Sequence, residues 1–367
     1  MKVAIVYDRV NKWGGAERVL LALHEIFPEA PLYTSVYDPD GALWAKVFPK
    51  VVTSFLQKIP YANKNHEFFA PLMPSAFAFF DFSEYDLVIS VTSEAAKGIK
   101  TSGKTRHICY CLTPTRYLWS GYNQYFKSLI FKNISKPVVG LLRRWDKRVA
   151  GRPDKMIAIS TAVQERIKKY YRRDSEIIFP PVDIPGSQIT NSKTQANNKL
   201  QKHNYYLLVS RLDFGYKKVD LAINAFNKSG RLLVIVGTGR EEGRLRRMAK
   251  DNIVFAGRVD EKKLKGYFAG AKALIMPQEE DFGIVAVEAQ SYGVPVIAYK
   301  KGGAEDTVID GKTGILFDKQ NIRSLEGAIK NFEKTRFNKR LIIANAGRFA
   351  KERFKKEFLD LIKKMLN

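Results

Sequence analysis

Short runs of apolar, β-branched residues recur along this chain, separated by longer stretches with helical periodicity. Such alternation is typical of βαβ units, in which a helix joins two parallel strands. Several of the runs lack inside/outside alternation, which indicates strands covered on both faces. The sequence therefore predicts an α/β fold with parallel sheets. The expected strands are 3–7, 87–91, 107–112 and 156–159 in the first half, and 205–209, 232–236, 253–256, 273–276 and 294–298 in the second.

The chain is long enough for two domains, each with a core of its own, because it has 367 residues. Pro180 and Pro181 interrupt any helix near its middle, and a polar stretch follows from 187 to 203. We therefore expect two doubly wound domains joined by a hinge, the first over 1–179 and the second over 180–345. Doubly wound sheets bind ligands outside the carboxyl ends of their strands, which favours a cleft between the domains.

The amino-acid composition limits the kinds of partner that this protein is expected to bind. The net charge of +25 implies an anionic partner, such as a phosphorylated substrate, an anionic lipid or a nucleic acid. Residues 127–173 hold fourteen Lys or Arg against three acids, so the positive surface belongs mainly to the first half. No apolar run approaches the roughly 18–20 residues of a membrane span. The two cysteines fit a reducing cytoplasm, and the short apolar start, interrupted by Asp8, is not expected to act as a signal peptide.

Glycine turns follow two expected strands. Gly14-Gly15 precedes a helical pattern after 3–7, and Gly237-Thr238-Gly239 follows 232–236. Glycines allow close backbone approach, and the N–H groups at a helix start attract phosphate. Either turn could also be a tight turn without a ligand. Because the third glycine after 232–236 is displaced from the dinucleotide pattern, we expect a single nucleotide phosphate here rather than a dinucleotide.

Charged residues follow two other strands of the second half. Arg211 and Lys217 come after 205–209, where two cations could clamp a diphosphate, or could simply belong to a solvated loop. Glu280 lies in a loop after 273–276, and Glu288 lies inside the helix expected over 283–292. A carboxylate in the loop can bind sugar hydroxyls, and one in the helix can bind a ribose diol.

These residues together resemble glycosyltransferase family 4, whose members are retaining enzymes. Glu280, Phe282, Gly283 and Glu288 match its Glu-x7-Glu motif. Further motifs occur in family order, and the resemblance covers nearly the whole chain. It is nearest to bacterial mannosyltransferases of surface-polysaccharide assembly, of the O-antigen or capsule type. The further motifs are Gly14-Gly15-Ala16-Glu17-Arg18-Val19, Thr113–Trp119, Ser210-Arg211-Leu212, Gly237-Thr238-Gly239, Gly302-Gly303 and Asp310–Gly314.

The resemblance implies the GT-B fold, with two Rossmann-like domains facing a cleft. It also implies that a C-terminal helix, 346–367, crosses back to the first domain; this helix overlaps a long basic amphipathic pattern over 341–366. Arg211 and Lys217 would neutralise the diphosphate leaving group, and Glu280 would contact the donor sugar. The donor would also be bound by the ribose ligand Glu288, by backbone groups at Phe282, Gly283 and Ile284, and by Gly14, Gly15, Gly237 and Gly239.

On the acceptor side the chain departs from the family, because Leu112 stands where many members carry a histidine. Asp8 or His66 could replace that group, and Arg116 and Tyr117 belong to the motif that follows Leu112. No metal or cofactor is expected. We interpret Asp38-Pro39-Asp40 as a turn and the alternating His107, Cys109 and Cys111 as buried strand residues.

The expected function is therefore metal-independent, retaining transfer of a hexose from a nucleotide sugar, with GDP-mannose favoured over UDP-sugars. The expected acceptor is a glycan or a polyprenyl-diphosphate-linked glycan. The enzyme would be cytoplasmic, and could dock peripherally on the anionic inner face of the membrane. A catalytically silent sugar-nucleotide binder is a second interpretation. A nucleic-acid-binding protein is a remote one, because no aromatic-basic motif for base stacking is present.

Overall fold

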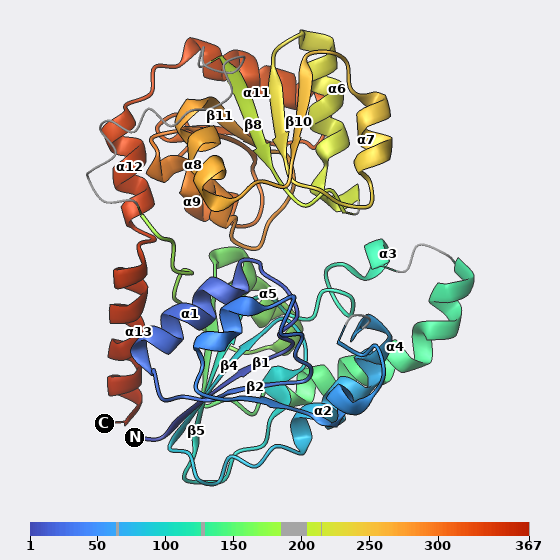
Figure 1. The fold of residues 1–367 in the computed structure, drawn as a ribbon, viewed down its shortest axis with the longest axis vertical. Helices are drawn as coiled ribbons and strands as arrows, with labels where there is room; N and C mark the ends of the chain where they lie inside the picture. Colours follow the sequence, from blue (N-terminus) through green and yellow to red (C-terminus); the bar gives the residue numbers. More distant parts are fainter. Residues whose placement is uncertain (64–65, 126–128, 185–203, 214, 367) are drawn as a thin grey trace. The chain divides into compact units, whose positions relative to one another are not determined.

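The computed structural model describes residues 1–63, 66–125, 129–184, 204–213 and 215–366. Two compact units make up the chain, and each is described by itself. The first unit comprises Met1–Pro181 with Phe354–Asn367, and the second comprises Val182–Arg353 (Figure 1). The division thus falls two residues after the boundary expected at 179, and eight residues after the one expected at 345.

The first unit is built on a seven-stranded parallel sheet with the order β3-β2-β1-β4-β5-β6-β7. Four of its strands were expected from their apolar runs and are confirmed. The other three have only two or three residues each, too few to show a period. The strands are β1 Val3–Tyr7, β2 Leu32–Thr34, β3 Val51–Thr53, β4 Leu87–Thr92, β5 Arg106–Cys111, β6 Lys155–Ala158 and β7 Glu176–Ile177.

Helices cover this sheet on its two faces. The C-terminal helix α13 belongs here, because Phe354 and Phe358 are buried and pack against Tyr110 of β5. Short 3-10 turns lie between several of the strands. The helices are α1 Ala16–Ile26, α2 Met73–Ala78, α3 Tyr122–Tyr125, α4 Leu129–Val149, α5 Thr161–Tyr171 and α13 Lys351–Leu366, and the 3-10 turns are η1 Leu43–Val47, η2 Phe55–Lys58, η3 His66–Leu72 and η4 Ala96–Gly98.

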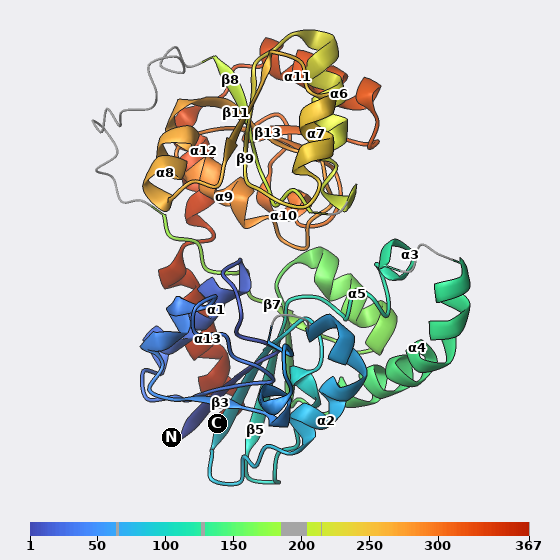
Figure 2. The ribbon, with the colours of Figure 1, turned by 45° about the vertical axis from the view of Figure 1, so that its right-hand side comes forward.

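A sheet flanked by helices also builds the second unit (Figure 2). Its six parallel strands have the order β10-β9-β8-β11-β12-β13. One buried cluster joins the sheet to α6, α7 and α11, and another joins its opposite face to α8 and α9. The strands are β8 Tyr205–Val209, β9 Leu233–Val236, β10 Ile253–Gly257, β11 Ala271–Met276, β12 Val296–Tyr299 and β13 Gly314–Phe317. The helices are η5 Gly215–Lys217, α6 Val219–Ser229, α7 Glu242–Met248, α8 Glu261–Gly270, α9 Ile284–Ser291, α10 Ala304–Thr307, α11 Ile322–Lys334 and α12 Lys339–Gly347.

The prediction of one long helix over 341–366 is wrong. α12 ends at Gly347 and α13 begins at Lys351. Between them the backbone pairs with Val182, whose N–H donates to the carbonyl of Phe349 at 2.9 Å and whose carbonyl accepts from Lys351 N–H at 3.1 Å. Phe349 is buried against the ring of Phe282. Contacts with residues distant in the sequence therefore break a pattern that is locally helical.

Among the described residues, no helix is long and apolar enough to cross a membrane.

Candidate active site

Both sheets reverse their strand order at the centre. In the second unit the reversal lies between β8 and β11, and in the first unit it lies between β1 and β4. Ligands of open parallel sheets bind outside the carboxyl ends of the strands at such a switch point. In the second unit the two flanking loops are 210–218, which contains Arg211 and Lys217, and 277–283, which contains Glu280.

An ion pair joins the two loops of the second unit. The Nζ atom of Lys217, at the end of η5, donates to Oε1 of Glu280 over 2.5 Å. The two side chains are 13% and 22% exposed, so the pair is partly shielded and still reachable by a ligand. Gln278 Nε2 donates to the same oxygen over 3.0 Å. The structure therefore brings together two of the three residues predicted as catalytic.

Arg211, the third predicted catalytic residue, follows β8 directly and is exposed. Within the described part of the chain its side chain makes no hydrogen bond or ion pair. Its guanidinium is thus not committed to a protein carboxylate, unlike the ammonium of Lys217. A planar guanidinium in this setting suits a phosphate oxygen pair.

The Phe282-Gly283 pair shapes the start of α9. The ring of Phe282 is buried and lies edge-on to Phe349, with ring centroids 5.4 Å apart. Gly283 is the N-cap residue of α9 and has a φ of 84°, a left-handed conformation that suits glycine. No side chain caps the helix, and Ile284 opens its first turn. Phe282 therefore anchors the turn with its side chain, and only backbone groups of this segment can serve a ligand.

Gly302 and Gly303 pack against the backbone of the loop that contains Glu280 and Phe282. A Cβ atom on Gly302 would lie 2.3 Å from the carbonyl oxygen of Glu280, and one on Gly303 would lie 2.2 Å from that of Phe282. The N–H of Gly303 donates to the Glu280 carbonyl over 2.8 Å. The loop that follows β12 thus fixes the backbone of Glu280, and any side chain at either glycine would displace it.

Gly237 and Gly239 have a packing role that sequence reasoning missed. A Cβ atom on Gly237 would lie 1.9 Å from the carbonyl oxygen of Ser210, and one on Gly239 would lie 2.4 Å from the carbonyl carbon of Leu212. The N–H of Leu212 also donates to the Thr238 carbonyl over 2.9 Å. These glycines let the loop after β9 press against the loop that carries Arg211. Glycine is therefore required at both positions whether or not a phosphate binds there.

Glu288 projects from α9 and is half-buried. The Ser291 hydroxyl donates to its carbonyl oxygen over 2.7 Å, which leaves the side chain out of that contact. Burial, opposed by Lys265 and reinforced by the charge of Glu288, raises the pKa of Tyr292. Glu288 lies on α9, the helix that begins after Gly283, as predicted from the sequence.

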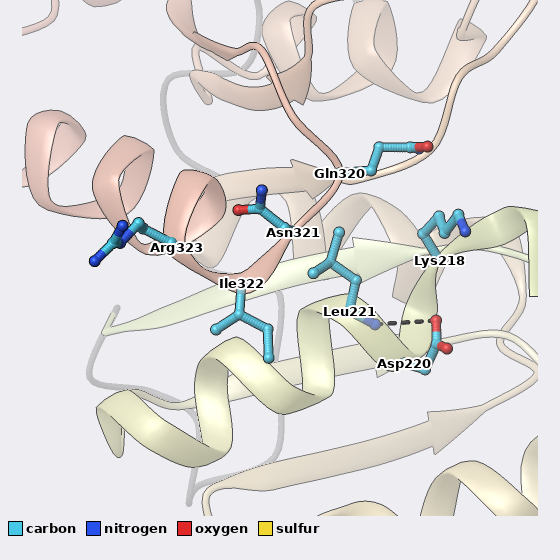
Figure 3. A pocket seen from close by; sticks show the side chains of 7 residues that line it. All are labelled: Lys218, Asp220, Leu221, Gln320, Asn321, Ile322 and Arg323. Carbon is cyan, nitrogen blue, oxygen red and sulfur yellow. Dashed lines mark hydrogen bonds between the residues drawn. The ribbon is translucent and has the colours of Figure 1, made fainter.

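A cavity of about 630 Å³ lies near these loops but contains none of the predicted site residues. Figure 3 shows its lining side chains coming from the start of α6 and from the segment that enters α11. It is connected to the loop after β11 through Gln320, whose Nε2 donates to the Pro277 carbonyl over 2.9 Å. We place the candidate site at the switch point because the paired charges lie there. The cavity is lined by Lys218, Asp220, Leu221, Gln320, Asn321, Ile322 and Arg323.

In the first unit, Asp8 occupies the switch point between β1 and β4. The residue is buried, and burial with the nearby charge of Glu94 raises the pKa of its carboxyl. Its oxygens accept hydrogen bonds of 2.7–3.0 Å, which fix the start of η4 to the end of β1. This gives Asp8 a structural role. The donors are Thr92 Oγ1 and the backbone N–H groups of Ser93, Glu94, Ala95 and Ala96.

Gly14 and Gly15 are exposed, and Gly15 starts α1 without a side-chain cap. Below them lies Glu17, a residue that the sequence reasoning left without a role. Glu17 is 3% exposed, and Tyr7 donates its hydroxyl to Oε1 over 3.0 Å. Its other oxygen, Oε2, has no hydrogen-bond partner among the described residues and would lie 3.0 Å from a Cβ atom on Gly14. Burial raises the pKa of this carboxyl.

Arg116 and Tyr117 are half-buried in the turn that follows β5. Burial, with the charges of Glu94 and Asp146 adding, raises the pKa of Tyr117. The turn is held by Asp146 of α4, which accepts from Thr115 Oγ1 over 3.0 Å and from Trp119 Nε1 over 2.7 Å.

Asp146 is in turn paired with a buried lysine that the sequence did not reveal. The Nζ atom of Lys97 lies 2.6 Å from Asp146 Oδ1, and both side chains are almost completely buried. Leu112, at the start of the same turn, is half-buried. The side chain of His66 lies outside the described residues.

Asp38-Pro39-Asp40 forms a turn, as expected, with the Asp40 N–H donating to Asp38 Oδ1 over 3.3 Å. His107 is buried on β5 and shares a 2.8 Å hydrogen bond with Ser90, and burial lowers its pKa to about 3. In the described part of the chain, no three His, Cys, Asp or Glu side chains gather closely enough to hold a metal ion.

Comparison with known proteins gives this geometry a context. Residues 190–350 match the family described as glycosyl transferases group 1. The chain is 34% identical over 146 residues to an uncharacterized 41.2 kDa protein of the cps region of Klebsiella pneumoniae, covering 38% of this chain and 40% of that protein. It is 36% identical over 110 residues to a GDP-mannose-dependent alpha-(1-6)-phosphatidylinositol monomannoside mannosyltransferase of Mycolicibacterium smegmatis, covering 26% and 29%. The alignments thus span less than half of these relatives' lengths.

Solved structures match over the whole chain. Sucrose-phosphate synthase from Thermosynechococcus elongatus superposes with a TM-score of 0.77 at 17% identity, covering 100% of this chain and 99% of that one. HepE of Anabaena, solved in complex with UDP-glucose, gives a TM-score of 0.71 at 19% identity, covering 99% and 100%.

The fold is therefore GT-B, as expected, with two Rossmann-like parallel sheets. Residues 190–350, which make up most of the second unit, match a glycosyl transferase family, in agreement with the class of enzyme expected from the sequence.

Proposed function

We propose that the whole chain is a retaining glycosyltransferase that moves a hexose from a nucleotide sugar to an acceptor glycan. The observation that supports this best is the Lys217–Glu280 pair at the switch point of the second unit, with the exposed Arg211 on the same loop as Lys217. Two cations there can take up the negative charge of a departing diphosphate, and stabilising that charge is usually the largest electrostatic contribution to such a reaction.

In the proposed reaction, the bond between the sugar's anomeric carbon and the diphosphate oxygen breaks as the acceptor oxygen bonds to the same face of that carbon. The acceptor proton passes to the leaving diphosphate. Arg211 and Lys217 stabilise the diphosphate, Glu280 binds sugar hydroxyls, and Glu288 binds the ribose. The backbone at Gly283 contributes donors, and none of these residues acts as a nucleophile.

We propose GDP-mannose as the donor. The resemblance to bacterial mannosyltransferases supports this choice, and so does the named activity of the Mycolicibacterium relative. UDP-sugars are the second candidate, because HepE was solved with UDP-glucose. A thermal-shift panel of GDP, UDP and ADP with their sugar conjugates separates these choices, and we expect the largest stabilisation with GDP-mannose.

The proposed acceptor is a lipid-linked glycan of surface-polysaccharide synthesis, reached by peripheral docking on the anionic inner face of the membrane. Helix α4 supports this, because Ile134, Val138 and Leu141 form an exposed apolar stripe at helical spacing. The exposed charged side chains of α4 that follow the stripe are all positive. The one acidic residue of α4, Asp146, is buried and paired with Lys97. Such a surface can insert apolar side chains while cations meet lipid headgroups. The exposed cations of α4 include Lys136, Arg144, Lys147 and Arg148.

The site assignment is tested by donor turnover, measured as release of GDP from GDP-mannose with water as acceptor. We expect Arg211→Ala and Lys217→Ala to slow turnover by about a hundredfold, the size of losing one charge-stabilising donor. Glu288→Ala should mainly weaken nucleotide binding. Arg323→Ala, which changes only the nearby cavity, serves as the control and should leave turnover unchanged. Unchanged turnover in the first three variants would contradict the assignment.

A further inference from the structure

A buried glutamine lies directly behind the candidate donor site and has no role in the proposed reaction. Gln278 follows β11 and is 6% exposed, although its side chain is polar. Its Nε2 atom donates to Glu280 Oε1 over 3.0 Å. The same oxygen accepts from Lys217 Nζ over 2.5 Å. One carboxylate oxygen of Glu280 is thus held by two donors from different loops.

A bound diphosphate should affect the two donors, Lys217 and Gln278, differently. Lys217 carries a full charge on a flexible stem, so a bound diphosphate competes with Glu280 for its ammonium. Gln278 is neutral and buried, so its amide should gain little by exchanging its hydrogen bond to Glu280 for one to a phosphate. When Lys217 turns to a bound diphosphate, Gln278 can still donate to the Glu280 carboxylate.

The position of Gln278 is itself fixed. It follows Pro277, whose carbonyl accepts from Gln320 Nε2 over 2.9 Å, and β11 pairs with β8 and β12 on its two sides. The backbone of Glu280 is held separately by Gly303. A side-chain donor on a fixed backbone can therefore set the direction in which the carboxylate of Glu280 points.

We propose that Gln278 is a positioning residue for the donor sugar, holding Glu280 toward the sugar hydroxyls once Lys217 has turned to the diphosphate. This rests on the proposed nucleotide-sugar function. It assigns Gln278 to recognition of the sugar and not of the nucleotide. The affinity for a nucleoside diphosphate should therefore be independent of Gln278, while the affinity for its sugar conjugate should depend on it.

The test is calorimetric titration of the full chain with GDP and GDP-mannose, and with UDP and UDP-glucose, using whichever pair the wild type binds. Gln278→Met keeps the side chain's shape and removes its donor. We expect it to bind the sugar nucleotide about tenfold more weakly, the size of one lost hydrogen bond to a charged group. Binding of the free diphosphate should change less than twofold. Should Gln278→Met fail to fold, Gln278→Leu offers the same loss of the donor.

Two controls separate positioning from general structural support. Gln320→Met removes the other glutamine that contacts this loop without touching Glu280, and should weaken both ligands equally or neither. In a Glu280→Ala background, Gln278→Met should cause no further loss, because its partner is gone.

Equal weakening of both ligands by Gln278→Met would overturn the inference, as would unchanged binding of the sugar nucleotide or a loss that persists without Glu280. A wild-type chain that binds none of the four compounds would instead overturn the proposed function, and this inference with it.

Discussion

The two units share one sheet plan but differ in the polar groups they bury. The first unit buries ionisable side chains, which are Asp8, Glu17, Lys97, His107 and Asp146. In the described part of the second unit the buried polar side chains are all neutral, and they are Gln278, Gln290, Ser291, Thr307, Thr313 and Asn345. A buried charge costs desolvation unless it is paired, whereas a buried amide needs only hydrogen bonds. The first unit should therefore respond more strongly than the second to pH and to the loss of a charged partner.

The same contrast holds at the two switch points. In the first unit, buried Asp8 joins the loops after β1 and β4 through bonds to fixed backbone groups. In the second unit, the loops after β8 and β11 are joined by the partly exposed Lys217–Glu280 pair. In the first unit, the connection between the loops is made by hydrogen bonds from the protein to buried Asp8. The Lys217–Glu280 pair of the second unit can exchange one partner for a ligand, which is consistent with the donor site proposed there.

The largest effect should come from the buried ion pair of the first unit. Asp146→Asn leaves Lys97 buried without a carboxylate, and breaking such a pair costs about 3–5 kcal/mol. Chemical denaturation followed by hydrogen exchange should show this loss in the first unit alone. Glu333→Gln is the matched control, because its partner Arg231 is partly exposed, and it should cost under about 1 kcal/mol. Similar losses in the two variants would remove the contrast.

A second prediction concerns acid. The pKa of buried His107 is lowered from 6.5 to about 3, so the folded first unit holds it neutral. The stability that this neutral form contributes is present above pH 6.5 and is lost as the pH falls toward 3. At pH 4.5 the loss should be on the order of 2–3 kcal/mol. His107→Gln should remove this part of the acid dependence in thermal unfolding between pH 7 and 4.5. A variant with the wild-type pH profile would speak against it.

A carboxylate can be introduced into the buried amide network of the second unit. Asn345 donates through Nδ2 to Gln290 Oε1 over 2.7 Å and to the Thr307 carbonyl over 2.9 Å. Asn345→Asp replaces a donor with a carboxylate facing two acceptors. Arg348, whose Nη1 donates to Asn345 Oδ1 over 2.9 Å, should offset part of this loss, so the net cost should be about 1–2 kcal/mol at pH 7. Protonation of the new carboxyl should reduce that cost at low pH. Asn331→Asp, on the exposed side of α11, is the control and should change stability little. Equal effects in both variants would show that burial is not the cause.

The smallest effect should come from Glu17. Its carboxyl pKa is raised from 4.5 by burial, so the protonated form is favoured in the folded first unit. That contribution is complete below the ordinary pKa and is lost as the pH rises through the raised value. Glu17→Gln cannot ionise and should unfold at a higher temperature than the wild type at pH 8. The difference should vanish near pH 4, and a constant difference across this range would contradict the prediction.

The sequence predicted the strands that are long enough to form a continuous apolar run. Runs of four or more apolar residues, such as 205–209, became strands, while Leu32–Thr34 and Glu176–Ile177 were too short to show one. The break between α12 and α13 could not be foreseen, because it depends on pairing with Val182, about 170 residues away in the chain. A local pattern has no access to such a contact.

The candidate site divides in the same way. Lys217 and Glu280 were predicted from motifs, and the structure brings them into contact across 63 residues of sequence. Gln278 and the Lys97–Asp146 pair were not predicted, because a single glutamine or a single acid among basic residues has no spacing that marks it. The Lys97–Asp146 pair forms only when η4 and α4, which are separate in the sequence, become neighbours. Gln278 lies two residues from its partner Glu280, but its place beside Lys217 depends on contact between two separate loops.

The glycine contacts between loops constrain how the proposed donor site can be altered. Gly237 and Gly239 fit against the backbone of 210–212, and Gly302 and Gly303 fit against that of 280–282, with no room for a Cβ atom. The backbones of the two loops in each pair are therefore complementary in shape. A chimera designed to change donor preference should exchange matched pairs together, since a transplanted single loop would meet a neighbour shaped for a different backbone.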